Sequence, residues 1–198
     1  FGIDAELLID HAWGYETCRM SDIKNYHSEE HSLSNGQVLM RNYSFDEALV
    51  IVREMTDNLV LDLFEKGLVT SSLTLWIAYD HRYEHEASKG TVKLERESNS
   101  SKKIIDAVED LYLRIADRYT GIRRIEVCAN RVAPESYVQY SLFDDPKQTD
   151  KERHLQEAVL NVKQRYGKNA IMRGSNLLEC STYRERNEQI GGHRCLLY

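Results

Sequence analysis

The stretch Val69-Thr-Ser-Ser-Leu-Thr-Leu-Trp-Ile-Ala78 decides how this chain folds. Its odd-numbered residues are mainly apolar, and its even-numbered residues are hydroxylated or small except for Trp76. A period of two residues places alternate side chains on opposite faces of an extended chain, which is typical of a β-strand with one buried face. We therefore predict a strand over residues 69–78 that turns its leucines toward a core.

A long amphipathic helix is predicted before this strand. Ser44 and Glu47 have the spacing of a capping box, in which each side chain satisfies a backbone N–H group at a helix N-terminus. Apolar residues then recur every three or four positions until Gly67, which favours a helix that buries one face. The apolar face comprises Phe45, Leu49, Val52, Met55, Leu59 and Leu63.

Three further elements are predicted after the strand. A polar loop over residues 81–89 leads to a second strand over residues 91–97, so the two strands form a long-looped hairpin. Serines 98, 100 and 101 are N-cap candidates for a helix that ends before Gly121. Residues 122–130 alternate again, with Ile125, Val127 and Ala129 facing inward. The apolar face of this second helix comprises Ile104, Ile105, Val108, Leu111 and Ile115.

The element order predicts the fold class. A first strand is expected over residues 31–40, broken or bulged at the turn-prone pair Asn35-Gly36. The order strand, helix, strand, strand, helix, strand predicts an α+β fold of the split βαββαβ type. This fold is a four-stranded antiparallel sheet with two helices on one face. A short helix over residues 3–13 precedes it, and a third helix, capped by Thr149 and Glu152, begins a helical tail.

Two helices on one face leave the other face of the sheet uncovered. That face is predicted to be polar and partly basic, which is compatible with phosphate contact but equally typical of the solvated side of an antiparallel sheet. Trp76 on this face could stack on a nucleotide or be covered by the tail or the N-terminal helix. The side chains assigned to the face are Ser32, Ser34, Thr74, Trp76, Lys93 and Arg124.

The charge balance argues mildly against a polyanionic partner, because the formal net charge is −6. Residues 1–131 contain 16 Lys and Arg against 23 Asp and Glu, and residues 133–198 contain 10 against 9. Any surface that binds nucleic acid must therefore be a single face. The apolar runs are too short to cross a bilayer, so we expect no membrane partner and a cytoplasmic protein. The four cysteines show no CxxC spacing, which favours a reducing compartment.

Three segments together resemble the little finger domain of Y-family translesion DNA polymerases: His31-Ser-Leu-Ser-Asn-Gly-Gln-Val-Leu-Met40, Leu94-Glu-Arg-Glu-Ser-Asn-Ser-Ser-Lys-Lys-Ile104 and Ile122-Arg-Arg-Ile-Glu-Val127. The tail, with Gly167-Lys-Asn-Ala-Ile171 and Ile190-Gly-Gly-His193, is similar to the C-terminal extension of the UmuC-like (ImpB/MucB/SamB) bacterial branch. The resemblance implies residues 1–15 as the end of a thumb helix, 16–28 as a linker and 29–133 as the little finger. Residues 134–150 would be a loop with a clamp-binding peptide, and 151–198 a helical extension.

The resemblance implies that the open sheet face grips primer–template duplex through its phosphates, independently of base sequence. Three acidic residues near that surface, Glu95, Glu97 and Glu126, depart from this pattern and predict weak binding by this part of the protein alone, as does His31 where the family is more basic. The residues carried over as DNA contacts are Ser32, Ser34, Arg41, Lys93, Arg96, Arg123 and Arg124.

An apolar island, Gln139-Tyr140-Ser141-Leu142-Phe143, lies in the polar connection before Asp144-Asp145-Pro146. It resembles the short peptide by which bacterial replication and repair proteins hold the DNA sliding clamp, a Gln followed by two loosely defined residues and Leu-Phe. Leu142 and Phe143 would each bury a side chain in an apolar groove of the clamp. The alternative is that this pair folds back onto its own domain.

No catalytic site is expected in this chain. In the family that it resembles, nucleotidyl transfer uses two Mg²⁺ ions held by carboxylates of a palm domain in the first half of the polypeptide, to which nothing here corresponds. We expect no cofactor, Asp144-Asp145 as a solvated pair, and no zinc at His27/His31 or His81/His85. The chain starts at Phe1, so we expect a fragment of a longer, nucleoid-associated bacterial enzyme. The alternative is a protein-interaction or ligand-binding module without a nucleic-acid role, which palm carboxylates upstream would exclude.

Overall fold

The computed structural model describes residues 2, 4–26, 31–82, 84–136, 145–190 and 193–194. The chain divides into two compact units, Phe1–Glu30 and His31–Tyr198. The first unit contains the helices α1 (Asp4–Ala12) and α2 (Met20–Asn25). The end of α1 before Gly14 confirms the sequence prediction, and α2 adds a short helix within the expected linker. The Asp22 carboxylate begins α2 by accepting a hydrogen bond from the backbone N–H of Arg19 at 2.9 Å.

The second unit contains the predicted order of strands and helices. Its first six elements are β1 (Ser32–Tyr43), α3 (Phe45–Glu65), β2 (Leu68–Tyr79), β3 (Ser88–Ser98), α4 (Ser101–Ile115) and β4 (Ile122–Asn130). The remaining elements are β5 (Ala133–Pro134), α5 (Pro146–Tyr166), the 3₁₀ helix η1 (Gly174–Leu177), α6 (Tyr183–Asn187) and the two-residue strands β6 (Gln189–Ile190) and β7 (His193–Arg194).

The main sheet has the strand order β1-β4-β2-β3, and all neighbouring strands are antiparallel. β4 therefore lies between β1 and β2, the two strands that α3 connects, which is the split βαβ arrangement that the sequence predicted. The structure adds β5, which pairs with the start of β2 through two residues. The four long strands and the α+β class are confirmed, and β5 makes the sheet five-stranded.

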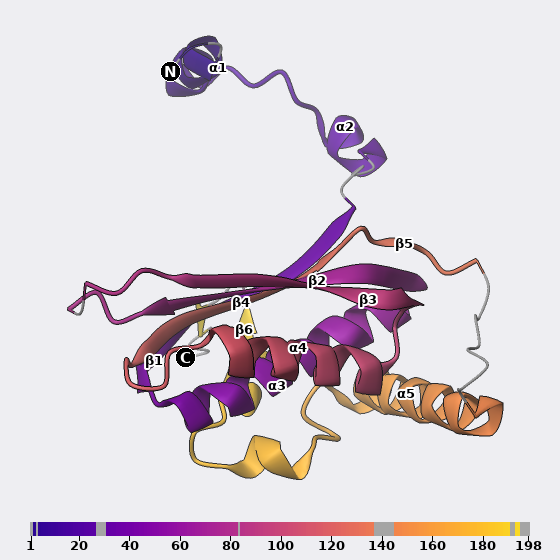
Figure 1. The fold of residues 1–198 in the computed structure, drawn as a ribbon. Coiled ribbons are helices and arrows are strands. Elements are labelled where there is room, and N and C mark those ends of the chain that lie inside the picture. Colours follow the sequence, from indigo (N-terminus) through magenta and orange to yellow (C-terminus); the bar gives the residue numbers. More distant parts are fainter. Residues whose placement is uncertain are drawn as a thin grey trace. The chain divides into compact units, whose positions relative to one another are not determined.

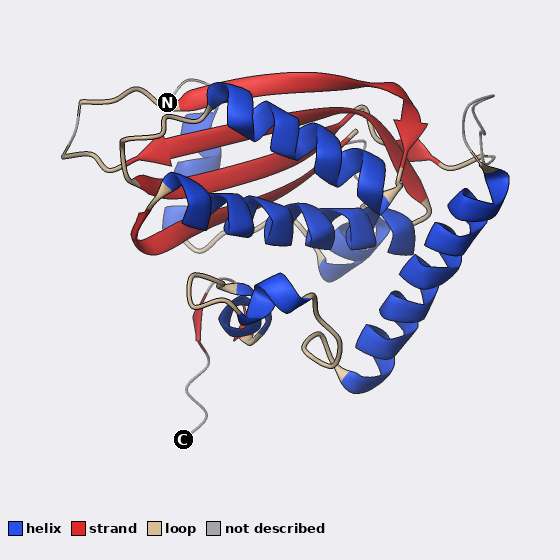
Figure 2. Ribbon diagram, turned by 60° about the horizontal axis from the view of Figure 1, so that its bottom comes forward, coloured by secondary structure: helices blue, strands red, loops and turns tan. Residues whose placement is uncertain are grey.

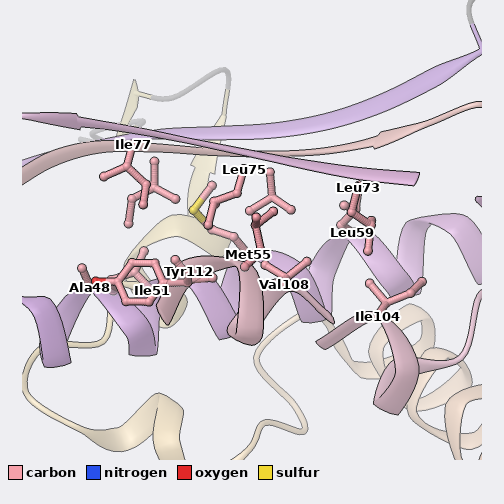
Figure 3. Close-up of a cluster of buried hydrophobic side chains, with 14 of the residues drawn as sticks. Ala48, Ile51, Met55, Leu59, Leu73, Leu75, Ile77, Ile104, Val108 and Tyr112 are labelled. Atoms are coloured by element: carbon pink, nitrogen blue, oxygen red, sulfur yellow. The ribbon is translucent and has the colours of Figure 1, made fainter. Parts of the chain in front are cut away.

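Both crossover helices, α3 and α4, cover the same face of this sheet (Figures 1 and 2). The core is the layer between them, where inward side chains of the strands meet the apolar faces of the helices (Figure 3). Burying each large aliphatic side chain contributes roughly 1.5–3 kcal/mol, so this layer is the main source of stability. Its fully buried members include Leu39, Ile51, Met55, Leu59, Leu73, Leu75, Ile77, Ile104, Leu111 and Tyr112.

Gly90 allows α4 to approach the sheet closely. A Cβ atom at this position would lie 2.7 Å from Leu111 Cδ1 and 3.0 Å from Ile115 Cγ2. Leu111 is buried, so a larger residue would force the helix or its side chains to move. The glycine therefore fixes the spacing between α4 and β3.

The N-terminus of α3 has the predicted capping box. The Ser44 hydroxyl accepts from the backbone N–H of Glu47, and the Glu47 carboxylate accepts from the backbone N–H of Ser44 at 2.9 Å. At its other end the helix stops before Gly67, whose φ of +62° lies in the left-handed region that suits glycine. Both predicted boundaries of this helix are confirmed.

The predicted bulge at Asn35-Gly36 was wrong. β1 pairs with β4 in regular register from Ser32 to Val38, and its irregularity lies between Val38 and Tyr43. Gly36 has no positive φ, and the Asn35 amide is used by the tertiary structure, donating to the carbonyl of Met55 in α3. The turn preference of this pair is therefore overruled by contacts with α3.

The predicted start of the third helix was also wrong. α5 begins at Pro146, and the carboxylate of Asp145 caps it by accepting from the backbone N–H of Lys147 at 3.0 Å. Pro at the first helical position fits this start, because its missing N–H group has no helical partner there. Asp145 is consequently an exposed helix cap, and Asp144 lies outside the described residues.

Glu152, expected to cap its own helix, instead binds the N-terminus of the preceding helix, α4. Its carboxylate accepts from the Ser100 hydroxyl and from the backbone N–H of Lys102, both at 2.9 Å. An anion at the N-terminus of α4 is favourable because of the unpaired N–H groups and the helix dipole. With Gln156, which is buried and donates to the carbonyl of Asn99 at 3.0 Å, it attaches α5 beside α4.

The rest of the described C-terminal extension also lies on the helix side of the sheet (Figures 1 and 2). Arg173 forms an ion pair with Asp57 of α3 at 2.6 Å. The backbone N–H of Thr182 donates to Glu54 of α3 at 3.3 Å, and burial raises the pKa of that carboxyl. Arg186 of α6 hydrogen-bonds to the Asn35 side chain of β1. In the described part of this extension, these contacts leave the opposite face of the sheet uncovered.

Candidate nucleic-acid interface

The sheet face opposite α3 and α4, here called the open face, is defined by the strand register. In register across β1, β4, β2 and β3, the outward residues form four rows. These rows are Ser32–Asn130–Ser72–Lys93, Ser34–Cys128–Thr74–Thr91, Gly36–Glu126–Trp76–Lys89 and Val38–Arg124–Ala78. The register confirms that five residues assigned to this face from the sequence do share it: Ser32, Ser34, Thr74, Lys93 and Arg124. Contact of these residues with DNA stays a prediction.

Hydroxyl and amide groups occupy much of this face. The Asn130 amide donates to the Thr74 hydroxyl at 2.8 Å, and that hydroxyl lies 2.9 Å from the hydroxyl of Thr91. Between them and Ser34 lies Cys128, whose thiol pKa is raised by partial burial and by the Glu126 carboxylate. Neutral donors of this kind can contact phosphate oxygens without reading base sequence.

Arg124, Trp76 and Glu126 interact at one end of the face. The Arg124 guanidinium carbon lies 5.1 Å from the centroid of the Trp76 ring, within cation–π range. The Arg124 Nη2 atom lies 3.5 Å from a carboxylate oxygen of Glu126. The group that lies over the Trp76 ring among the described residues of the second unit is thus the Arg124 guanidinium. Cover of this ring by the tail or by the N-terminal helix stays a prediction.

Arg123 is brought beside Arg124 by an irregularity in β4. Ile122 and Ile125 are both buried, although residues three apart in a regular strand face opposite sides. The register explains this: Ala78 pairs with Arg124 and Tyr79 with Ile122, so Arg123 is an extra residue relative to β2. A bulge of this type re-aims side chains, and it places two consecutive arginines between two core residues.

Lys89 is a residue of the open face that the sequence interpretation missed. It was assigned to the loop after β2, but it belongs to β3 and pairs with Trp76. The alternation Lys89, Thr91, Lys93 carries the signal that could have found it. With it, the rows of the open face hold three basic residues and one acidic residue, Glu126.

Arg96 lies at an irregular part of β3. The register steps from Thr70–Ser98 to Ser72–Lys93, so residues 94–97 lie against one residue of β2. Arg96 is exposed there between the two exposed acids Glu95 and Glu97, which reduce the local positive potential. Its predicted phosphate contact stays a prediction.

Arg41 lies outside the paired rows of the open face, apart from the other residues predicted to contact DNA. Its guanidinium donates to both carboxylate oxygens of Glu47, at 2.6 and 3.1 Å, and lies 4.1 Å from the centroid of the Tyr43 ring. This bidentate contact holds the pKa of Glu47 at about 2, assisted by the Ser44 backbone N–H. Arg41 therefore has a structural partner at the N-terminus of α3, and its DNA contact remains untested.

The predicted clamp peptide, Gln139 to Phe143, lies outside the described residues. The segments on both sides of it are described. Glu135 forms an ion pair with Arg153 of α5 at 2.7 Å, and Asp145 caps the same helix. Both ends of the connection are therefore attached to α5.

The described residues contain no group of three or more His, Cys, Asp or Glu side chains that could hold a metal ion. His81 and His85 are used locally, near Asp80 at 3.6 Å and Asp117 at 3.5 Å respectively. In the part of the chain that the structure describes, no helix is both long and apolar enough to span a membrane.

Comparison with known proteins gives a family match over most of the second unit. A sequence model described as the impB/mucB/samB family C-terminal domain matches residues 30–142. The chain is similar to DNA polymerase IV 2 of Bacillus subtilis (strain 168), with 25% identity over 164 residues that cover 82% of this chain and 39% of the relative. DNA polymerase IV 2 of Halalkalibacterium halodurans is 21% identical over 168 residues, covering 84% and 40%. The chain thus spans about two fifths of the length of these relatives.

Solved structures similar to this chain include a complex of a β-clamp processivity factor with the little finger domain of PolIV. That match has a TM-score of 0.41 and 12% identity, and it covers 58% of this chain and 100% of the other. A chimeric Y-family DNA polymerase matches with a TM-score of 0.40 and 15% identity, covering 67% of this chain and 36% of the other.

The Arg41–Glu47 contact predicts how stability depends on pH. Glu47 has a pKa of about 2 in the folded protein and about 4.3 when unfolded, so its contribution is complete above the unfolded value and is lost as pH falls toward 2. Glu47→Gln should lower the free energy of unfolding by about 1 kcal/mol at pH 7 and flatten its decline between about pH 5 and pH 2. Urea unfolding at several pH values measures this. Glu157→Gln, an exposed change on α5, should leave the decline unchanged; an equal decline in both variants would contradict the assignment.

Proposed function

Since this chain belongs to the impB/mucB/samB family, whose C-terminal domain model covers residues 30–142, we propose that its second unit grips primer–template duplex DNA with the open face. The same proposal makes the connection before α5 a tether to the bacterial sliding clamp. The parent protein is proposed to be an error-prone translesion DNA polymerase, in line with the relatives named DNA polymerase IV 2.

The observation that carries the DNA proposal is the composition of the open face. No described helix of the second unit covers this face. It offers lysine, arginine, hydroxyl and amide groups in rows, and the spacing between neighbouring strands is about 4.8 Å. Such a face suits the phosphates of a duplex and carries no arrangement that would read base edges. Binding should therefore be independent of sequence and sensitive to salt.

The polymerase reaction is assigned to the parent protein and not to this domain. Phosphoryl transfer by two Mg²⁺ ions needs carboxylates that hold the metals about 4 Å apart. The described residues offer no such group, so we derive no catalytic step for this chain. Its contribution to the reaction would be to position the duplex.

A module without a nucleic-acid role is the alternative function. The proposed function predicts salt-dependent duplex binding that weakens when Arg123 and Arg124 are replaced, whereas the alternative function predicts neither result. They also differ in the sequence expected upstream, which must contain palm carboxylates only if the parent is a polymerase.

Replacing Arg123 and Arg124 together by Ala should weaken binding to any duplex sequence. It should also reduce the slope of log K against log salt by roughly 1 to 2, because each neutralised phosphate contributes about 0.9. Fluorescence anisotropy of a short labelled duplex across a salt series measures both quantities. The control changes Lys102 and Lys103 to Ala, two exposed residues at the start of α4 on the helix side. If the control loses as much affinity as the arginine variant, the open face is not the binding surface.

A synthetic peptide spanning residues 137–145 should bind a bacterial sliding clamp with a micromolar Kd. Leu142→Ala with Phe143→Ala should abolish binding, since the two lost side chains cost roughly 3–6 kcal/mol together. Isothermal titration calorimetry measures the affinity, and Ser141→Ala at a loosely defined position is the matched control. Equal binding by the double variant would remove the clamp from the proposal.

A further inference from the structure

One acidic side chain lies within the rows of the open face, and it is directed at an arginine. Glu126 is the only acid among the outward, strand-paired residues of β1, β4, β2 and β3. Its carboxylate lies 3.5 Å from the Arg124 Nη2 atom. We propose that Glu126 competes with DNA phosphate for the Arg124 guanidinium and thereby limits the strength of the grip. This inference rests on the proposed function and assigns a regulator within the same site.

The geometry determines which atoms compete. Arg124 is held across the sheet, with its guanidinium over the Trp76 ring at 5.1 Å from the centroid. Trp76 pairs with Glu126 on the neighbouring strand, so the arginine is held between the aromatic face and the carboxylate. The side chains of Arg124 and Glu126 are 51% and 38% exposed. Both are therefore within reach of a bound polyanion.

The neighbours of Glu126 direct its charge toward Arg124. On the β1 side it is paired with Gly36, which has no side chain, and a Cβ atom there would meet only Glu126 itself. On the β2 side the paired residue is the neutral Trp76, with Lys89 one strand further away. Along β4 the next outward residues are Arg124 and the Cys128 thiol. Of these groups, the Arg124 guanidinium is the cation in contact.

A phosphate that approaches Arg124 meets two obstacles. It must take the place of a carboxylate that already accepts from the guanidinium, and it must approach a second negative charge within a few ångströms. An exposed ion pair of this kind is worth about 0.2–1 kcal/mol, which corresponds to a change in affinity of roughly 1.4- to 5-fold. The effect is therefore a modest reduction of affinity and not a block.

A modest reduction suits a domain that moves along duplex DNA. Each advance by one base pair requires every phosphate contact to break and to form again on the next phosphate. An internal carboxylate offers Arg124 a partner whenever a phosphate leaves, so the guanidinium never has to be released unpaired. Trp76 keeps the side chain in place during the exchange.

The test compares duplex affinity and salt dependence for Glu126→Gln and the wild-type chain by fluorescence anisotropy. Glutamine keeps the size of the side chain and removes the charge. We expect Glu126→Gln to bind roughly two- to fivefold more tightly near 0.1 M salt and to steepen the slope of log K against log salt by up to about 0.9. Glu157→Gln makes the same charge change on the exposed side of α5 and should alter affinity less than 1.4-fold.

A second pair of variants isolates Arg124. Arg124→Ala alone should weaken binding. Adding Glu126→Gln to it should give clearly less gain than Glu126→Gln gives in the wild-type chain, because only the repulsion between carboxylate and phosphate is then removed and no arginine is left to compete for. A gain of the same size in the absence of Arg124, or an affinity for Glu126→Gln no tighter than for Glu157→Gln, would overturn the inference. If Arg124→Ala weakens binding while Glu126→Gln has no effect, only this inference fails. If neither the wild-type chain nor any variant binds duplex, the proposed function fails with it.

Discussion

Both crossover helices of the second unit pack on the same face of one sheet, and the rest of the structure depends on this constraint. α3 connects β1 to β2 and α4 connects β3 to β4, and their apolar faces meet the same layer of strand residues. Burial of the inward side chains then determines which residues face outward, because a shift in strand register by one residue would expose the core. The open face is thus the necessary counterpart of the packed face.

The same constraint explains how an acidic chain can have one face on which basic residues outnumber acidic ones. Its net charge is −6, but the acids are not spread evenly. α3 alone carries six Asp or Glu residues and one Arg, and it lies on the helix side. The rows of the open face hold Lys89, Lys93 and Arg124 against Glu126. Because screening limits exposed charges to about 10 Å at 0.1 M salt, the local balance matters more than the total for a bound duplex.

The periodic parts of the fold could be predicted from the sequence, and the parts set by tertiary contacts could not. The alternation in β2 and β4 and the capping box of α3 are local signals, and the structure confirms them. The pair Asn35-Gly36 favours a turn, but the Asn35 side chain forms hydrogen bonds with Met55 of α3 and with Arg186. Glu152 has the spacing of a cap for its own helix, yet it binds α4, some 50 residues earlier in the chain. The neighbouring sequence does not show whether such a side chain forms a local turn or cap or instead contacts a distant element.

In the candidate site, too, the positions set by strand alternation could be predicted, and those set by tertiary contacts could not. Alternation placed Ser32, Ser34, Lys93 and Arg124 on one face, whereas the position of Arg123 depends on a bulge that only the register of β2 and β4 reveals. Arg41 has a basic side chain at a suitable place in sequence, but its partner Glu47 is six residues further on, beyond the end of the strand. Contacts between elements therefore decide which of the cations lie on the open face.

The most direct test of the central claim, that duplex DNA lies on the open face, uses the two cysteines on opposite sides of the second unit. Cys128 lies within the rows of the open face, and Cys180 packs against the core on the α3 side. Both thiols are free and half-buried. The measurement is the rate at which a small thiol reagent labels each cysteine, followed by mass spectrometry with and without saturating duplex. The account predicts that DNA slows labelling of Cys128 and leaves Cys180 unchanged. Protection of Cys180 with no protection of Cys128 would contradict it.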